Sequence, residues 1–340
     1  MNAFADRLRG RRVLVTGGDG FIGSHLVEAL AEAGARVTAL ACYNAFGTHG
    51  WLDEISPPLR RAVALRRGDV RDRALMEALV EDQEIVLHLA ALIAIPYSYE
   101  APQSYVDVNV SGTLNLLEAC RRHGVARMVH TSTSEVYGTA RVAPIAEDHP
   151  LQGQSPYSAS KIGADMLAEA FARSFDLPVV VLRPFNTYGP RQSERAVLPT
   201  AIRQALDPRC TAIRLGDLAP RRDFNYVADI VLAFLAAAGA DGLDFGRAYN
   251  AGSGASVSIG DAVEEIRRQV ATDKPVESEA TRHRPVNSEV MELIADSTRL
   301  TAACGWRPRH ALAEGLALTI AWWRERLAAG RARADAEYLT

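Results

Sequence analysis

One carboxylate stands among hydroxyl side chains at a point where an apolar stretch of the chain ends. Residues 130–140 read HTSTSEVYGTA, in which Thr133 and Ser134 lead into Glu135. A carboxylate buried at a strand end has a raised pKa, which makes it a usable base or acid near neutral pH. We therefore expect proton transfer at Glu135. The plain alternative is that these residues only form a polar strand end.

A tyrosine and a lysine four residues apart form a second candidate for proton chemistry. Tyr157 and Lys161 lie in SPYSASKIGAD, and residues four apart share one face of a helix. A phenol of pKa about 10 is a poor base at neutral pH, but a nearby cation stabilises the phenolate. The pair predicts Tyr157 as an acid/base group and Lys161 as its tuner, although such pairs are also common on solvated helix surfaces.

Glycines that follow a strand and open a helix predict a phosphate-binding turn. In TGGDGFIGSH, Gly17, Gly20 and Gly23 satisfy G-x-x-G-x-x-G, and Gly18 offers the alternative register G-x-G-x-x-G. Such glycines let the backbone approach a pyrophosphate at the N-terminus of the helix. We therefore expect a dinucleotide to bind at this turn.

The residue type that would choose between NAD and NADP is missing from its usual place. An acid about 20 residues beyond the glycines normally holds the adenosine ribose, yet ALACYN at 39–44 contains no Asp, Glu or Arg. The prediction is NAD or NADP, with NAD the favoured of the two. Asp69, in RRGDVRD, is expected either to contact the adenine or to cap the helix that follows it.

The elements that must position these residues alternate along the first half of the chain. We expect strands at 11–17, 35–41, 84–91, 125–133 and 177–185, and helices at 21–34, 73–83, 111–124, 158–175 and, near the end of the chain, 311–327. Apolar strands separated by helices are typical of a parallel sheet covered on both faces. The predicted fold class is α/β, a doubly wound Rossmann sheet with a smaller α/β C-terminal lobe.

The domain organisation is predicted from a change of pattern after Pro184, where loops rich in Pro, Gly and Arg begin. Residues 1–185, with a return segment at about 226–250, are expected to form the NAD(P)-binding domain. Residues 186–225 and 251–330 are expected to form a substrate-binding lobe over the carboxyl ends of the strands, where such folds bind ligands. Residues 331–340 are expected to be a tail.

Composition excludes several classes of function. The chain has 340 residues, a net charge of -3 and scattered Lys and Arg, so neither a nucleic acid nor an anionic membrane is an expected partner. No apolar run approaches the roughly 20 residues that cross a bilayer, and no secretory segment is visible, so the cytoplasm is the expected location. The four cysteines are dispersed without C-x-x-C spacing, and we expect no metal site.

The motifs together resemble a known superfamily, the extended short-chain dehydrogenases/reductases, from about residue 10 to 325. The resemblance rests on TGGDGFIG at 16–23, HLAA at 88–91, the Tyr157 and Lys161 pair, RPFN at 183–186 and RDF at 222–224. More narrowly, CYNAFGTHGWLDE, TSTSEVYGTA, HPLQGQSPYSASKIGAD and RPVNSEVMELIAD resemble nucleotide-sugar 4,6-dehydratases that act on N-acetylhexosamine nucleotides.

This resemblance implies a set of binding residues. The implied cofactor contacts are Gly17, Gly20, Phe21, Ile22, Gly23, Asp69, Val70, Leu89, Ala90, Ala91, Tyr157, Lys161 and Pro184. The implied contacts with the nucleotide-sugar substrate are Asn186, Arg191, Arg222 and Arg284. Arginine suits a bidentate grip on phosphate, although surface ion pairing is the alternative for the three arginines.

The resemblance also implies roles in catalysis. Tyr157 takes the proton of the sugar 4-hydroxyl while Thr133 hydrogen-bonds the same oxygen. Glu135 removes the C5 proton, and Ser134 or Glu135 assists departure of the C6 hydroxyl. A simple 4-epimerase has no need of an acid at this position, because it only removes and returns a hydride at C4.

Three classes of function stay open. The first is the 4,6-dehydratase, and the second is a UDP-glucuronate decarboxylase or NDP-sugar 4-epimerase, which share oxidation at C4. The third is a non-catalytic NAD-binding regulator, against which the intact set of Glu135, Tyr157 and Lys161 argues.

A homodimer is expected from apolar residues on the helices predicted at 111–124 and 158–175. Gly112 and Leu116 on the first helix, and Ala164, Ala168 and Ala172 on the second, are expected to form faces that the sheet does not cover. Two such helices from each subunit would form a four-helix contact. The family resemblance implies the same pairing.

Overall fold

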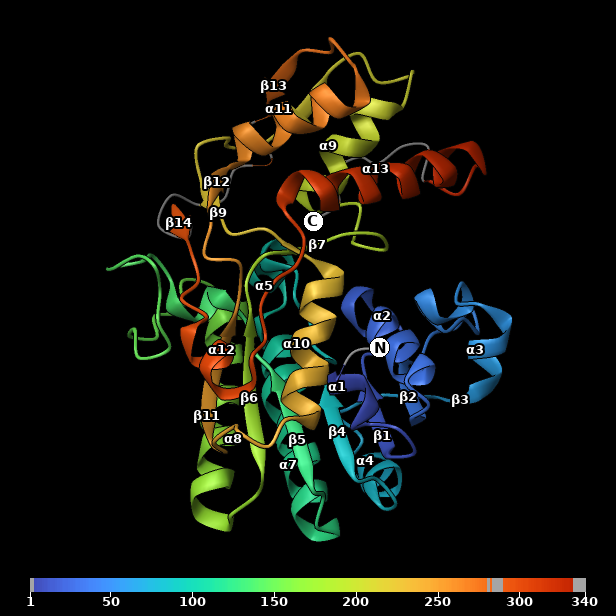
Figure 1. Ribbon diagram of the computed structural model, residues 1–340, viewed down its shortest axis with the longest axis vertical. Helices are drawn as coiled ribbons and strands as arrows, with labels where there is room; N and C mark the ends of the chain where they lie inside the picture. Colours follow the sequence, from blue (N-terminus) through green and yellow to red (C-terminus); the bar gives the residue numbers. More distant parts are fainter. Residues whose placement is uncertain (1–2, 280–281, 283–289, 333–340) are drawn as a thin grey trace.

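A seven-stranded parallel sheet forms the centre of the computed structural model, which describes residues 3–279, 282 and 290–332 (Figure 1). The strand order is β11-β6-β5-β4-β1-β2-β3, and each neighbouring pair is parallel. The strands are β1 (Arg12–Thr16), β2 (Arg36–Cys42), β3 (Val63–Gly68), β4 (Ile85–His88), β5 (Arg127–Thr131), β6 (Val179–Pro184) and β11 (Arg247–Ala251). The predicted doubly wound α/β fold is confirmed.

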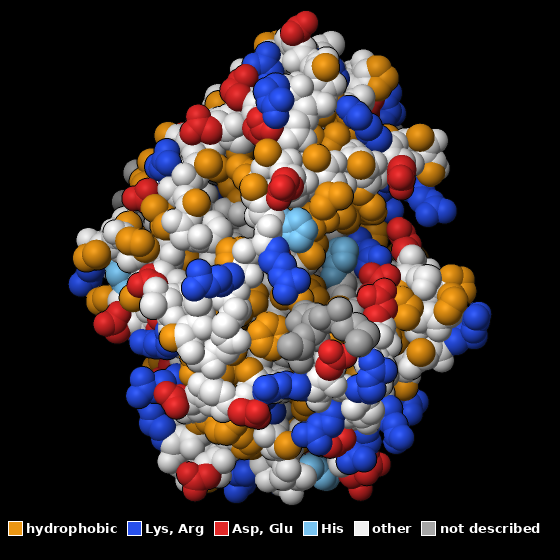
Figure 2. Space-filling model, in the orientation of Figure 1, with side chains coloured by type: hydrophobic (Ala, Val, Ile, Leu, Met, Phe, Trp, Pro, Cys, Tyr) orange, Lys and Arg blue, Asp and Glu red, His pale blue; other side chains and the backbone are white. Residues whose placement is uncertain are grey.

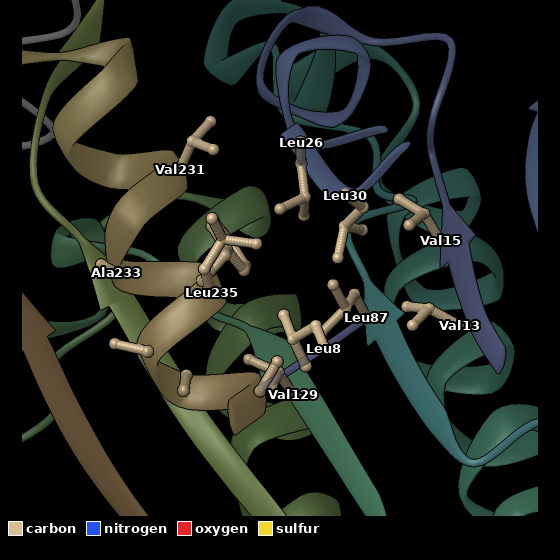
Figure 3. Close-up of a cluster of buried hydrophobic side chains, with 14 of the residues drawn as sticks. Leu8, Val13, Val15, Leu26, Leu30, Leu87, Val129, Val231, Ala233 and Leu235 are labelled. Carbon is tan, nitrogen blue, oxygen red and sulfur yellow. The ribbon is translucent and has the colours of Figure 1, made fainter. Parts of the chain in front are cut away.

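Helices cover both faces of the sheet, so β1, β4 and β6 are buried at nearly every position, whereas the edge strand β3 is not. These helices are α2 (Phe21–Glu32), α4 (Arg73–Val80), α7 (Gly112–His123), α8 (Pro156–Phe175) and α10 (Val227–Gly239). Val13 and Val15 of β1 join a core with Leu26 of α2 and Val231 of α10 (Figure 3). Leu14, which points to the other face, joins the core beneath α4, α7 and α8.

The C-terminal elements form a smaller group, which lies above the sheet in the view of Figure 1. They are α9 (Val197–Leu206), β8 (Ile213–Leu215), β9 (Arg221–Arg222), β12 (Val257–Ser258), α11 (Ile259–Val270), β13 (Val276–Ser278), β14 (Glu292–Leu293) and α13 (Leu312–Ala328). Their core is separate from the two cores of the sheet and includes Leu198, Ile202, Ile266, Leu316 and Trp323.

Short elements make up the connections. They are α1 (Ala3–Asp6), η1 (Gly50–Asp53), α3 (Pro57–Ala62), α5 (Ile95–Glu100), α6 (Pro102–Tyr105), the π-helix η2 (Val106–Ser111), η3 (Ser134–Tyr137), β7 (Thr187–Tyr188), β10 (Asn225–Tyr226) and α12 (Thr298–Cys304).

Local sequence fixes the start of α8, the helix that carries the Tyr157 and Lys161 pair. The Ser155 hydroxyl accepts a hydrogen bond from the Ser158 amide at 3.1 Å, and the Ser158 hydroxyl accepts one from the Ser155 amide at 3.0 Å. Pro156 occupies the first helical position, where its missing N–H is no loss. The first turn, which contains Tyr157, is therefore held at both ends.

Residues that were expected to face a partner subunit lie inside the molecule. Leu116, Ala164 and Ala168 are 0% exposed, and Leu116 and Ala168 belong to the core between the helices and the sheet. A Cβ on Gly112 would come within 2.7 Å of the Val70 side chain, so this glycine allows close packing within the subunit. The part of the dimer prediction that assigned these residues to a free face is wrong, because the sheet and its helices already cover them.

An aromatic and ionic contact joins α13 to the loop that follows β2. The Arg326 guanidinium lies over the ring of Trp51, 4.7 Å from its centroid, and over Trp322 at 5.2 Å. The same guanidinium pairs with Glu54 at 3.0 Å. The C-terminal group therefore contacts the sheet domain through the Arg326 side chain, in addition to the chain segments that connect the two.

Charges are mixed on the visible surface, where Lys and Arg alternate with Asp and Glu (Figure 2). Across the described residues, no helix combines the length and the apolar character that a membrane span requires.

Candidate active site

A cavity of about 1340 Å³ lies at the carboxyl ends of the parallel strands, between the sheet and the C-terminal group. Its wall contains every predicted cofactor contact: Gly17, Gly20, Phe21, Ile22, Gly23, Asp69, Val70, Leu89, Ala90, Ala91, Tyr157, Lys161 and Pro184. It also contains Thr133, Ser134, Glu135, Asn186 and Arg191. Segments far apart in sequence meet here because parallel strands place their carboxyl ends at one edge of the sheet.

The glycine turn forms a cradle with no room for side chains. Gly17 has a φ of +68°, and a Cβ there would come within 2.7 Å of the Ala90 amide nitrogen. A Cβ on Gly23 would lie 2.0 Å from the Gly17 carbonyl oxygen. Gly20 precedes α2 without a side-chain cap, and Gly18 packs toward the sheet core. The register is therefore Gly17, Gly20 and Gly23, which fits the pyrophosphate of a dinucleotide at the start of α2.

Two carboxylates and a thiol line the cavity beyond this turn. Asp19 accepts a hydrogen bond from the Cys42 amide at 3.1 Å, and burial raises the pKa of Asp19. Asp69 accepts from Arg71 Nε at 3.0 Å, and this bond lowers the pKa of Asp69. The cap of α4 is Asp72, which accepts from the Leu75 amide at 3.1 Å. The helix-cap alternative for Asp69 is therefore wrong.

Tyr157 and Lys161 are both buried at the cavity wall, at 8% and 3% exposure. Burial raises the pKa of Tyr157, while a hydrogen bond with Thr133 acts in the opposite direction. Burial lowers the pKa of Lys161 to about 8, and the charge of Asp165 opposes this. The sequence predicted a lowered phenol pKa through Lys161. In the structure, the loss of hydration around the phenol outweighs the hydrogen bond with Thr133, and the charges of Glu135 and Asp165 raise the pKa of Tyr157 further, so this prediction is wrong.

The segment after β5 brings its carboxylate close to this phenol. Thr133 caps η3 by accepting a hydrogen bond from the Glu135 amide at 3.2 Å. Ser134 is buried, and Glu135 is half-buried and close enough for its charge to raise the pKa of Tyr157. One part of the cavity therefore brings together Thr133, Glu135 and Tyr157. A hydroxyl proton and a neighbouring proton of a ligand could both be transferred there.

The predicted substrate contacts differ in their placement. Arg191 reaches α2, where it pairs with Glu28 at 2.6 Å. Arg222 is buried in β9, donates to the Arg221 carbonyl oxygen at 3.0 Å and does not line the cavity. Arg284 lies outside the described residues. Asn186 lines the cavity and keeps a buried side-chain oxygen that accepts no hydrogen bond from the described part of the chain.

Unsatisfied polar atoms gather on the same wall. Among the described residues, buried side-chain atoms that line the cavity and have no hydrogen-bond partner come from Thr131, Asn186, Gln192, Glu194, Arg203, Trp323 and Arg326. Buried polar groups are normally satisfied in a folded protein, so a concentration of exceptions indicates the place of a polar ligand. The sequence analysis missed most of these residues because nothing local marks them.

Two further residues beside Tyr157 and Lys161 were also missed. Asn109, in the π-helix, exchanges two hydrogen bonds with the Leu92 backbone and donates to the Ser160 hydroxyl, each at 2.9 Å. Asp165 follows Lys161 by four residues, and its carboxylate accepts a hydrogen bond from the Ser132 hydroxyl at 2.7 Å. The repeated spacing of Tyr157, Lys161 and Asp165 was a readable signal for the second of these.

No cluster of His, Cys, Asp or Glu suited to a metal ion occurs within the described ranges. The polar groups at the cavity instead fit a dinucleotide: a glycine cradle for phosphate, unsatisfied guanidinium donors, unsatisfied amide oxygens that accept, and a buried lysine beside the phenol.

Known proteins resemble this chain over nearly its whole length. Residues 14–319 match the family described as GDP-mannose 4,6 dehydratase. A UDP-glucose 4-epimerase of Mycolicibacterium smegmatis is 34% identical, and the match covers 93% of this chain and 99% of the relative.

Two solved structures extend the comparison. An NAD-dependent NDP-hexosamine 5,6-dehydratase of tunicamycin biosynthesis has a TM-score of 0.80 and 34% identity, over 93% of this chain and 98% of its own. The dTDP-glucose 4,6-dehydratase of Streptomyces venezuelae, solved with NAD bound, has a TM-score of 0.80 and 30% identity, with the same coverage of 93% and 98%.

Proposed function

The chain belongs to the NAD(P)-dependent nucleotide-sugar dehydratase and epimerase family of extended short-chain dehydrogenases/reductases, and from this premise we propose that it is a 4,6-dehydratase. Its substrate would be an NDP-hexose, and an N-acetylhexosamine nucleotide is the favoured class. The observation that carries the proposal is the convergence of Glu135 on Tyr157, because dehydration requires an acid/base group in addition to the phenol.

The cofactor of this proposal is held by the glycine cradle and by Lys161. Bound NAD(P) supplies reversible two-electron redox chemistry, accepting hydride from C4 of the sugar and returning it at C6. The 13 residues on the cavity wall that the sequence analysis assigned to the cofactor are proposed as its contacts. NAD is favoured over NADP, because the end of β2 offers Cys42 and no arginine.

The chain's own groups handle the protons. Tyr157 takes the proton of the 4-hydroxyl, and Thr133 hydrogen-bonds the same oxygen as it becomes a ketone. The ketone acidifies C5, from which Glu135 removes the proton. Ser134 or Glu135 then gives a proton to the C6 hydroxyl, which leaves as water. C5 takes up a proton as hydride returns at C6, so the net change is the loss of one water. Each group lines the cavity, and Thr133 and Glu135 both act on the pKa of Tyr157. The three side chains are therefore near one another, as these successive proton transfers require.

A 4-epimerase is the second candidate, supported by the 34% identical UDP-glucose 4-epimerase. Tyr157 and Lys161 would serve oxidation at C4 in that case, and Glu135 would have no proton to remove. A UDP-glucuronate decarboxylase is less well supported, because it would need a cation for the C5 carboxylate. A regulator without catalysis would leave the set of Thr133, Glu135 and Tyr157 without a purpose.

The experiment that separates these candidates is incubation of the purified protein with GDP-, UDP- and dTDP-linked hexoses and N-acetylhexosamines. Mass spectrometry reports the product directly. Loss of one water with a 4-keto product supports the dehydratase. An isomer of unchanged mass supports the epimerase, loss of carbon dioxide supports the decarboxylase, and no conversion of any sugar contradicts the proposal.

We also propose how the chain is organised around this reaction. Residues 1–185 and about 226–250 would bind the cofactor, while 186–225 and 251–330 would bind the sugar nucleotide, with Asn186, Arg191 and Arg284 among its contacts, whereas Arg222 does not line the cavity. A homodimer through α7 and α8 is proposed from the apolar side chains that these helices leave outside, such as Met166 at 43% and Phe175 at 50% exposure. Light scattering tests it: a mass near twice 36.8 kDa supports the dimer, and a stable monomer contradicts it.

A further inference from the structure

A buried arginine of the C-terminal group forms no ion pair with a carboxylate of the described residues, although the charge of Asp207 acts on it from a distance. Arg203, on α9, is 4% exposed, and its Nε forms no hydrogen bond with any described residue. No ion pair joins it to a carboxylate in the described part of the chain. Asp207, one helical turn further on, has its carboxylate occupied by Arg209 at 2.7 and 2.9 Å. A buried guanidinium without a hydrogen-bonded counter-ion is unfavourable, and the Asp207 carboxylate accepts its hydrogen bonds from Arg209, so Arg203 is expected to meet an anion from outside the chain.

The position of Arg203 on α9 directs it to the cavity. Ala196, Thr200 and Arg203 all line the cavity, and their spacing of four and three residues places them on one face of the helix. Leu198 and Ile202, on the opposite side, pack into the C-terminal core. Arg203 lies in the last turn of α9, so this face of the helix runs along the cavity from Ala196 to Arg203.

Most other arginines of the cavity wall are already paired. Arg71 pairs with Asp69, Arg191 with Glu28, Arg282 with Glu279 and Arg326 with Glu54. Each of these lies within ion-pair distance of a carboxylate, whereas no such pair is formed by Arg203 among the described residues. The difference identifies Arg203 as a buried arginine whose guanidinium is available to a ligand.

The glycine cradle and α9 belong to different parts of the molecule. Gly17 follows β1 and Gly23 lies in the first turn of α2, whereas Arg203 comes from a helix whose core is built with α11 and α13. The cofactor pyrophosphate is assigned to the cradle, so the anion at α9 has to be a second one. Within the proposed function, the remaining anion is the diphosphate of the sugar nucleotide.

We propose that Arg203 binds the diphosphate of the nucleotide-sugar substrate and thereby helps to select nucleoside diphosphates over uncharged ligands. A guanidinium suits this role because its planar donors can grip two phosphate oxygens at once, and burial makes the interaction stronger than at the surface. The inference rests on the proposed function for the identity of the ligand. It does not depend on which reaction follows binding.

Calorimetric titration of UDP, GDP and dTDP into the full-length protein tests the proposal. The nucleoside diphosphate that the wild type binds most tightly should bind at least 10-fold more weakly to Arg203→Gln. Arg203→Lys should restore part of this affinity through its point charge. NAD affinity should change less than 2-fold. The matched control is Arg268→Gln, which removes an exposed arginine of α11 that pairs with Glu265 and should leave all affinities unchanged.

The melting temperature shows whether Arg203→Gln loses affinity because it folds poorly. Because Arg203→Gln removes a buried charge that forms no ion pair among the described residues, the variant without nucleotide should melt at the same temperature as the wild type or higher. The nucleoside diphosphate should then raise the melting temperature of the wild type more than that of the variant. A variant that melts lower in the absence of nucleotide would show that Arg203 has a structural role, and would contradict the proposal.

Three further results would overturn the inference. Unchanged nucleoside diphosphate affinity in Arg203→Gln would remove its basis. An equal loss of affinity for the uncharged nucleoside would assign Arg203 to the base or ribose, and a larger loss for NAD would assign it to the cofactor. If no sugar nucleotide is converted although Arg203→Gln loses diphosphate affinity, the proposed reaction fails and the binding inference stands.

Discussion

Arg183 donates hydrogen bonds from Nε and Nη2 to one carboxylate oxygen of Asp165, at 3.2 and 3.0 Å, with both side chains buried. The Ser132 hydroxyl donates to the same oxygen, and His130 contacts the other at 3.2 Å. Burial on its own would raise the pKa of Asp165, but the hydrogen bond with His130 and the charge of Arg183 lower it. The carboxylate is therefore kept ionised one helical turn beyond Lys161.

Asp165→Asn should destabilise the fold by about 3–5 kcal/mol, because it leaves the buried Arg183 charge without compensation. Urea unfolding measures this, with Asp241→Asn as the control, since the Asp241 side chain is 91% exposed and its change should cost under about 0.5 kcal/mol. The folded-state pKa of Asp165 is lowered, so its contribution is present above about pH 4 and lost as the pH falls further. The deficit of Asp165→Asn should therefore shrink in acid, and a constant deficit would refute the linkage.

Glu135→Gln should stop dehydration and leave oxidation at C4 intact, because the amide keeps the shape and loses the base. Turnover is expected to fall at least about 100-fold. Reduced cofactor should build up after substrate is added, which its near-ultraviolet absorbance reports. A variant that dehydrates at the parent rate would show that another group removes the C5 proton.

Tyr157→Phe should fail one step earlier than Glu135→Gln. The 4-hydroxyl proton then has no acceptor, so no reduced cofactor should form, and turnover should fall about 10²–10⁴-fold. NAD affinity and the melting temperature serve as controls and should stay close to those of the wild type. Build-up of reduced cofactor in this variant would exclude Tyr157 as the first base.

Lys161→Met should alter how stability depends on pH. The pKa of Lys161 is lowered from 10.5 to about 8, so between these values the unfolded chain binds more protons than the folded protein. The wild type should therefore gain stability relative to Lys161→Met as the pH rises from about 8 to about 10.5. Urea unfolding at intervals across this range measures the difference. A difference that does not change with pH would mean that Lys161 keeps its ordinary pKa in the fold.

Gly17→Ala should abolish dinucleotide binding, because its Cβ would press against the Ala90 amide at 2.7 Å. Gly124→Ala is the matched control: its φ of +63° is similar, and nothing lies within 4 Å of the added carbon. The control should cost about 1–2 kcal/mol of stability from the backbone conformation alone. NAD titration of both variants separates the two effects, and equal NAD affinities would contradict the cradle.

The parts of the site that sequence predicted well are those defined by neighbours along the chain. The spacing of Tyr157 and Lys161 needs only a helix to bring both groups together, and the turn at Gly17 needs only a strand followed by a helix. Arg203 carries no such mark, because whether a carboxylate pairs with it depends on how α9 packs against α11 and α13. Asp69 shows the same limit: whether Asp69 or Asp72 caps α4 depends on backbone geometry that composition does not reveal.

The same distinction applies to the fold. The helices at α2, α7 and α13 were predicted within a few residues, because each has one apolar and one polar side. α10 was expected only as part of a return segment. Its sequence, VADIVLAFLAAAG, is apolar almost all round, since it packs against both the sheet and α2, and it lacks the periodicity that indicates a helix.

The contact of Arg326 with Trp51 has a kinetic consequence under the proposed reaction. Both residues line the cavity together with Asp19 and Gly20, so α13 closes the side of the cavity beside the glycine turn. A dehydrogenase that exchanged its cofactor in every cycle would have to open this closure each time. An enzyme that regenerates the cofactor within the cycle does not have to open this closure. The dinucleotide can then behave as a prosthetic group, which stays bound to the protein through dilution and gel filtration while sugar nucleotides bind and dissociate.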